Sequence, residues 1–136
     1  MKQLLSLPFL SYILISCVGP PEPDHGLVEN LPAIVNTSSA FSFNVRGDNY
    51  TFEESISLTL KLQDGNAVAS TLIVTDYKSK DTTMVRLEDS SGGKIYEYVV
   101  TGNVTRVDGE STNKPTKAII KGKKFTGILE WTVTAN

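Results

Sequence analysis

Apolar and polar side chains alternate with a period of two along most of the chain, and this pattern limits the fold more than any other feature. Between Ile56 and Leu62 every second residue is apolar, and Ser, Thr or Lys stands between. Phe41, Phe43 and Val45 alternate in the same way. Successive side chains of a β-strand point to opposite faces, so the pattern predicts strands with one buried and one solvated face. No window has the spacing of an amphipathic helix, and we expect essentially no helix.

Turn signals divide the alternating pattern into short strands. Asp64-Gly65 is a strong hairpin signal, and Gly122-Lys123 indicates a turn before a long final strand. Short strands at this spacing favour an all-β fold, a single antiparallel β-sandwich or a small barrel of about eight to nine strands. The expected strands lie at 41–45, 50–52, 56–62, 68–77, 83–87, 94–101, 103–107, 117–121 and 124–134.

The tripeptide Arg46-Gly47-Asp48 occurs in integrin ligands, but its surroundings favour another interpretation. Alternating runs stand on both sides of it, and Gly followed by Asp-Asn suits a tight hairpin turn. We therefore interpret it as a turn.

The N-terminus resembles a bacterial lipoprotein signal. An apolar run from Leu4 to Ile15 follows Lys2, which suits a signal peptide and is too short to span a bilayer. Leu14-Ile15-Ser16-Cys17 then resembles the lipobox, in which the cysteine becomes a lipidated N-terminus. The resemblance implies diacylglycerol on the sulfur of Cys17 and normally an acyl chain, such as palmitate, on its amine. The alternative is an ordinary secreted protein with a free thiol at this position.

These features divide the chain into three parts. Residues 1–16 form the signal peptide, 17–39 the lipidated cysteine with a Pro-rich flexible tether, and 40–136 the β-domain. The expected location is the cell envelope, with the domain outside the cytoplasm and a lipid anchor in a membrane. In a Gram-negative cell we favour the outer membrane over the inner one.

Charge and residue types exclude several functions. Removal of Lys2 with the signal peptide leaves twelve of the thirteen basic residues and all fifteen acidic ones, so the formal net charge is −3. A negative net charge argues against nucleic-acid binding. The only histidine, His25, lies in the tether, so histidine-based catalytic or metal sites are not expected. We interpret the neighbouring carboxylates as charges that face solvent: Glu53-Glu54, Glu88-Asp89, and Asp108 with Glu110. We therefore expect no enzyme, metal or cofactor; a carboxylate-dependent hydrolase is the alternative.

Two groups of residues are candidates for binding. Lys121, Lys123 and Lys124 belong to a basic stretch that suits an anionic lipid or glycan, although lysines also protect strand edges from pairing. Tyr96 and Tyr98 suit the apolar face of a sugar. Trp131 is a third aromatic candidate, but it shares a strand face with Leu129, so we interpret it as core.

Both ends of the domain resemble a class of small bacterial lipoproteins of unknown function. The resemblance lies in "AFSFNVRGDNYTF" at the start and "KKFTGILEWTVT" at the end, and not in the middle. It implies a β-rich lipoprotein domain without a known activity. The sequence thus predicts a membrane-anchored envelope lipoprotein whose β-domain is a non-catalytic binding or structural module for a protein or glycan partner.

Overall fold

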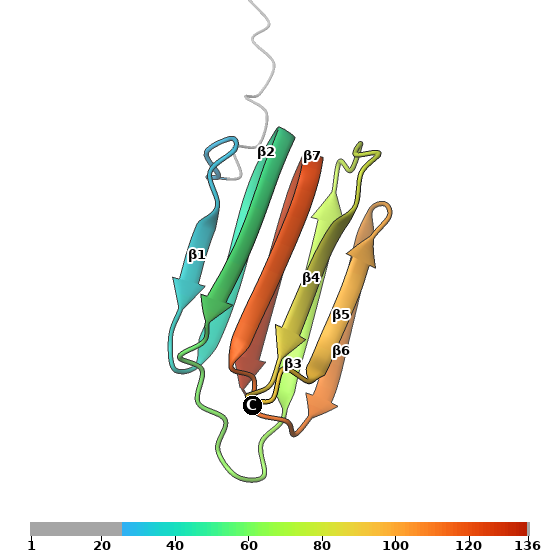
Figure 1. Ribbon diagram of the computed structural model, residues 1–136. Coiled ribbons are helices and arrows are strands. Elements are labelled where there is room, and N and C mark those ends of the chain that lie inside the picture. Colours follow the sequence, from blue (N-terminus) through green and yellow to red (C-terminus); the bar gives the residue numbers. More distant parts are fainter. Residues whose placement is uncertain (1–25, 136) are drawn as a thin grey trace, which may run out of the picture.

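The computed structural model describes residues 26–135, and this part of the chain is all-β (Figure 1). It contains no helix, and hence none long and apolar enough to cross a membrane. The seven strands are β1 (Ala33–Asn36), β2 (Ala40–Ser57), β3 (Val68–Thr75), β4 (Thr83–Glu88), β5 (Lys94–Val100), β6 (Val104–Ser111) and β7 (Lys117–Ala135).

The strands form one antiparallel sheet that curls over into two facing layers, a half-barrel (Figure 1). One layer has the order β1-β2-β7-β3-β6, and in the other β7 pairs with β4, which carries β5. Both layers share β2 and β7. Residues 40–47 of β2 pair with 127–134 of β7, and residues 52–57 pair with 117–122. The sequence expectation of an all-β antiparallel fold is therefore confirmed.

The two long strands fold over together at one end of the molecule. We call this place the corner; it comprises residues 47–52 of β2 and 122–127 of β7. The strand register shifts twice here, and Asn49, Lys124 and Gly127 have φ values of 51°, 49° and 140°. Asn36 of β1 pairs with Phe41 near the start of β2, and its side-chain amide donates to the carbonyl of Ser57, at the end of β2, at 2.9 Å. The fold-over therefore brings the two ends of β2 close together.

At the corner the structure differs from two predicted turns and from the predicted number of strands. Arg46-Gly47-Asp48 does not form a hairpin turn, because both arms continue as one strand and pair with β7 rather than with each other. Gly122-Lys123 likewise lies inside β7. The chain does change direction near these glycines, but the predicted strands at 41–45, 50–52 and the start of 56–62 all belong to β2, and those at 117–121 and 124–134 belong to β7. With β1, which was not predicted, the described residues contain seven strands rather than eight or nine.

Three further boundaries differ from the prediction. The predicted tether reaches residue 39, but Ala33–Asn36 already pairs with β2 as β1. The predicted strand at 56–62 ends at Ser57, because the chain must leave one layer to reach β3 in the other. β6 extends to Ser111, four residues beyond the predicted end at residue 107.

The core lies between the layers. Phe41, Phe43 and Val45 are fully buried, as their alternation predicts. Trp131 and Leu129 are buried as well, so the predicted dry face of the final strand is confirmed. The Trp131 and Phe41 rings meet edge to face with their centroids 5.6 Å apart.

Candidate functional site

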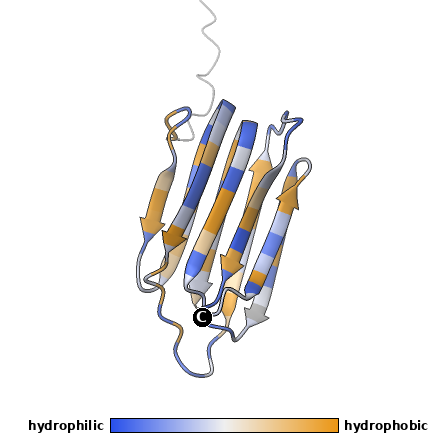
Figure 2. Cartoon of the chain, in the orientation of Figure 1, coloured by the Kyte–Doolittle hydropathy of each residue, from blue (hydrophilic) through white to orange (hydrophobic). Residues whose placement is uncertain are grey.

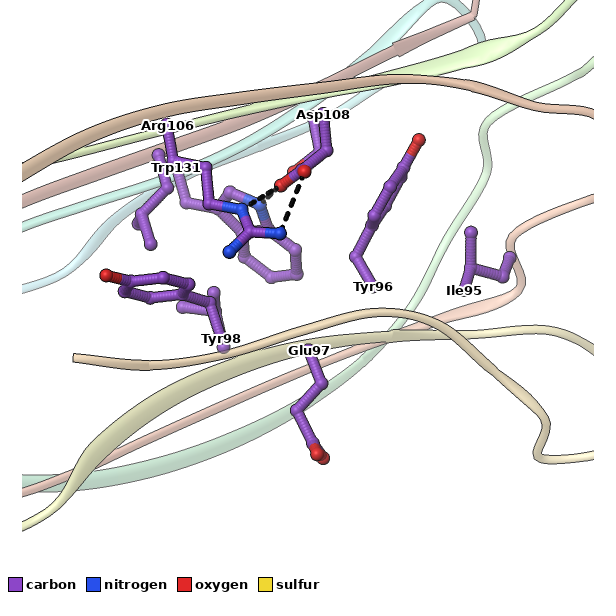
Figure 3. A pocket seen from close by; sticks show the side chains of 10 residues that line it. Ile95, Tyr96, Glu97, Tyr98, Arg106, Asp108 and Trp131 are labelled. Carbon is purple, nitrogen blue, oxygen red and sulfur yellow. Dashed lines mark hydrogen bonds and ion pairs between the residues drawn. The ribbon is translucent and has the colours of Figure 1, made fainter.

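A cleft opens between the edge strands β5 and β6, where the two layers face each other without pairing. It encloses about 250 Å³. Its floor comes from the core and its rim from the two edge strands (Figure 3). The lining residues are Ser70, Leu72, Val85, Ile95, Tyr96, Glu97, Tyr98, Arg106, Asp108 and Trp131.

The tyrosines predicted as binding residues both line this cleft. Tyr96 and Tyr98 lie two residues apart on β5, so the period of the strand turns them to the same face. The Tyr96 hydroxyl donates to the Val68 carbonyl at 3.0 Å, which fixes its ring. Tyr98 is partly buried, and its hydroxyl makes no hydrogen bond to any described residue. Tyr98 therefore offers its ring, and a hydroxyl without a partner among the described residues, to a ligand.

Arg106 and Asp108 face the tyrosines from β6. The Arg106 Nε and a terminal nitrogen donate to the two Asp108 carboxylate oxygens at 2.6 and 3.0 Å, a bidentate pair. Hydrogen bonding to Asp108 and its negative charge raise the pKa of Arg106 above its ordinary value. The guanidinium carbon also lies 5.1 Å from the centre of the Tyr98 ring. Each charged group thus holds the other in a fixed direction.

Trp131 forms part of the floor. Its ring is 1% exposed, and its Nε1 donates to the buried Ser70 hydroxyl at 2.9 Å. The structure therefore confirms Trp131 as a core residue. Because it also lines the cleft, its emission reports on whatever enters there.

Glu97 borders the cleft but points away from it (Figure 3). Its carboxylate pairs on the outer face with Lys94, at 3.1 Å, and with Arg86. Hydrogen bonds from Lys94 and then Arg86 lower the pKa of Glu97. Among the described side chains that line the cleft, Asp108 is the carboxylate directed inward, and it is held by Arg106.

The predicted lysines lie elsewhere. Lys121 pairs with Glu53 at 2.5 Å and Lys123 with Asp81 at 3.8 Å, while Lys124 belongs to the corner. None of the three lines the cleft. The interpretation as edge protection is wrong for Lys121, because β7 pairs with both β2 and β4 at this residue. All three lysines extend from a central strand into solvent.

Other sequence-predicted sites are placed as follows. Cys17 and His25 lie outside the described residues. Among the side chains that the structure describes, no three of His, Cys, Asp or Glu come close enough to hold a metal ion. Glu53 and Glu88 are engaged in ion pairs with Lys121 and Arg86.

Sequence reasoning missed the role of Arg106 and placed Asp108 in a loop. The available signal was their spacing, since residues two apart on a strand share a face. An Arg and an Asp on one face of a strand can form a pair whether or not that face is buried. Nothing in the sequence placed this face opposite Tyr96 and Tyr98.

Comparisons with known proteins provide no family. No family model and no curated protein matches the sequence. Among solved structures, a chain from Bacillus endospore appendages, a family of disulfide-linked pili, has a TM-score of 0.43 and 13% identity over 76% of this chain and 88% of that one. A family 29 carbohydrate-binding module, solved with cellulohexaose and with mannohexaose, has a TM-score of 0.36 and 12% identity over 76% of this chain and 75% of that one. Scores this low carry no argument about function.

Proposed function

We propose that this protein is a non-catalytic binding module and that its β5–β6 cleft takes one ring of a glycan. The observation that carries the proposal is the group formed by Tyr98, Arg106 and Asp108 at the mouth of a cavity of about 250 Å³. Ligand sites commonly combine apolar walls with a few fixed polar groups in this way.

A sugar ring needs both kinds of surface. Its C–H faces pack on aromatic rings, and its hydroxyls need donors and acceptors side by side. Tyr96 and the Tyr98–Arg106 pair border opposite sides of the cleft (Figure 3). The Asp108 oxygens accept and the remaining Arg106 N–H groups donate. Because these two groups already hold each other, a ligand pays little to order them.

Charge favours a neutral sugar over an acidic one. The Arg106 charge is matched by Asp108 within the cleft. An added carboxylate on the ligand would compete with Asp108 for the same guanidinium.

The non-catalytic part of the proposal rests on the placement of carboxylates. A glycosidase needs two carboxyl groups that face each other across the bond. Of the described carboxylates that border the cleft, Asp108 is paired with Arg106, and Glu97 points to the other side of the sheet.

A lipid anchor completes the proposal. We infer from the lipobox resemblance that Cys17 is lipidated and holds the domain in the cell envelope, and an outer membrane is the favoured site in a Gram-negative cell. Two or three acyl chains suffice for stable anchoring without a transmembrane segment. In this arrangement the module would bind a glycan of the envelope or its surroundings.

The cleft can be tested on a glycan array with the fluorescently labelled chain. We expect binding to neutral oligosaccharides that Tyr98→Ala and Arg106→Ala each abolish. Titration of the bound sugar should also change the emission of Trp131 on the cleft floor.

Arg86→Ala is the matched control. Arg86 is also held by a carboxylate, that of Glu97, but on the outer face. Binding that survives Tyr98→Ala, or is lost equally in Arg86→Ala, would count against the cleft. An array without any hit would count against a glycan ligand.

The anchor has a separate test. Cys17→Ala should leave an unprocessed or soluble chain that no longer partitions into detergent. An unmodified thiol on Cys17 in the membrane-extracted protein, measured by intact mass, would contradict lipidation.

A further inference from the structure

Exposed apolar side chains gather on one short segment that follows directly on the N-terminal residues. Val28, Leu31, Ile34 and Val35 are 64%, 58%, 44% and 50% exposed. We call these four residues the β1 strip. Among the described residues only two other large apolar side chains are exposed, and both lie on strands that border the cleft. Clustered apolar exposure of this kind marks an interaction surface.

The strip is a built part of the fold and not a loose end. The Asn30 N–H donates to the Arg46 carbonyl at 2.8 Å, and the Asp48 N–H donates to the Asn30 side-chain oxygen at 2.8 Å. These bonds tie the segment around Val28 and Leu31 to the corner. Below them, β1 pairs with β2 along one side only.

The edge position of β1 leaves both of its faces open. Ile34 stands opposite Phe43 and Val35 opposite Ser42, so they point to opposite faces, and both are exposed. Figure 2 shows β1 as a mainly hydrophobic strand at the edge of the sheet. A flat apolar medium that meets this edge would contact both side chains.

Charged residues lie beside the strip and not in it. Glu29 bridges to Arg46 of β2, and the Asp48 N–H bonds to the Asn30 side chain, so one basic and two acidic residues flank the strip. The four residues of the strip are uncharged, so the strip suits an apolar partner.

The length of chain before the strip limits what can cover it. Eight residues lie between Cys17 and Gly26, the first described residue, so nine residue-to-residue steps join the two. At about 3.3–3.6 Å per residue they reach about 30 Å at most. A lipid on Cys17 would hold Gly26, two residues before Val28, within that distance of the bilayer. Contact between the strip and the bilayer is then an intramolecular event, for which weak affinity suffices.

We propose that the β1 strip lies on the surface of the bilayer in which Cys17 is anchored. This inference rests on the proposed lipid anchor. The contact stays at the headgroup level, because the free edge of β1 has backbone N–H and C=O groups that need water. β1 and β6 are the two ends of one layer, so contact through β1 turns the β5–β6 cleft away from the membrane and toward ligand.

The test uses the full lipidated protein in vesicles of phosphatidylethanolamine and phosphatidylglycerol. Cys17 is the only cysteine of the chain, and its sulfur would carry the lipid. Leu31→Cys or Val35→Cys then introduces a single thiol for an environment-sensitive fluorophore. Val107→Cys on β6 is the matched control, since Val107 is 68% exposed and lies at the other end of the layer.

We expect a blue shift and quenching by headgroup-level nitroxide lipids at positions 31 and 35, and neither at 107. Raising salt from about 0.1 M to about 0.5 M should leave the signal unchanged, since screening affects charged contacts and not apolar ones. Trp131 emission, recorded before labelling, verifies that each variant is folded.

Three results would overturn the proposal. Equal emission at positions 31, 35 and 107 would show that the strip does not touch lipid. A blue shift without vesicles, together with a dimer in sedimentation of the Cys17→Ser chain from residue 17 onward, would assign the strip to a second copy. A signal that salt abolishes would assign the contact to charge. Intact mass reports separately whether Cys17 carries lipid, so failure of the anchor is distinguished from failure of the contact.

Discussion

The corner and the β5–β6 edge are two ways of bringing the same two layers together. At the corner the backbone itself connects the layers, and rings fill the bend: Phe52 packs against Phe43 and Phe125 with centroid distances of 5.8 and 6.0 Å. At the β5–β6 edge no strand crosses, and the layers are bordered by Tyr98, Arg106 and a cavity.

The difference shows where this fold can accommodate a ligand. The corner has little room for change, because a side chain on Gly122 would come within 2.5 Å of the Phe52 ring. At the other edge, polar and aromatic side chains can vary without breaking a backbone connection. Binding residues on such a rim are positioned by rigid strands and remain accessible.

Trp131 belongs to the core and to the cleft floor, and its removal should have the largest effect. Trp131→Ala should cost about 3–5 kcal/mol, because it deletes a buried ring and orphans the Ser70 hydroxyl. A domain of this size has about 5–15 kcal/mol in total. Urea melts followed by circular dichroism measure the loss. Tyr98→Ala, on the rim, should stay within about 1 kcal/mol; equal melts for the two variants would contradict the contrast between core and rim.

The corner should be the next most sensitive place. Gly127 has a φ of 140°, and a β-carbon there would stand 2.8 Å from the Thr75 carbonyl oxygen. Gly127→Ala should therefore cost about 1–3 kcal/mol in the same urea melts. Gly102 has open space around it and no positive φ, so Gly102→Ala should be close to neutral. A neutral Gly127→Ala would mean that the corner can relax.

Two buried hydroxyls should respond with opposite signs. Thr83 pairs with Gly122 at the corner, and its hydroxyl is buried without a partner among the described residues. Thr83→Val should stabilise the fold by about 1 kcal/mol, because it removes an unpaired polar group at constant volume. Ser70 accepts from Trp131 near the cleft, so Ser70→Ala should destabilise the fold by about 1–3 kcal/mol. Thermal melts compare the two, and a loss in Thr83→Val would indicate that its hydroxyl is satisfied.

The smallest expected effect concerns the loop that leads into β5. Hydrogen bonds from the Ser91 hydroxyl and the Gly93 and Ser91 N–H groups lower the pKa of Asp89 below its ordinary 3.8. A depressed pKa contributes stability above the ordinary value, and this contribution is lost as pH falls through the folded value. Urea midpoints of the wild type and Asp89→Asn should therefore converge below about pH 3.8. Asp64→Asn, in an exposed turn, is the control, and a constant difference at all pH values would contradict the mechanism.

Sequence periodicity predicted burial better than it predicted pairing. Leu60 is 2% exposed, as the alternation from Ile56 to Leu62 predicts, yet it lies outside any strand. The segment after Ser57 must cross to the other layer, and on the way it buries Leu60 and packs the partly buried Leu58 and Leu62 against the core. Alternation with a period of two indicates which side chains face the core. It does not indicate whether the backbone pairs with a neighbouring strand.

The glycines predicted the positions of the bends correctly, but not the kind of bend. Gly47 and Gly122 mark points where the chain bends, as predicted, but the bend occurs in two paired strands at once. A local signal cannot distinguish a hairpin from a corner, since the difference lies in the partner strand. The cleft was hidden for the same reason, because Tyr98 and Arg106 meet only across the unpaired edges of two layers.

The central place of β7 also determines the order in which the molecule can form. β7 is the last strand in the sequence, and it pairs with β2, β3 and β4, so it is the neighbour that both layers share. Until its residues leave the ribosome, β2 lacks its main partner and the other strands can form only local pairs. Contacts that join the two ends of a chain are slow to form. The nascent chain should therefore stay open until β7 has been synthesised, and the two layers can join only then.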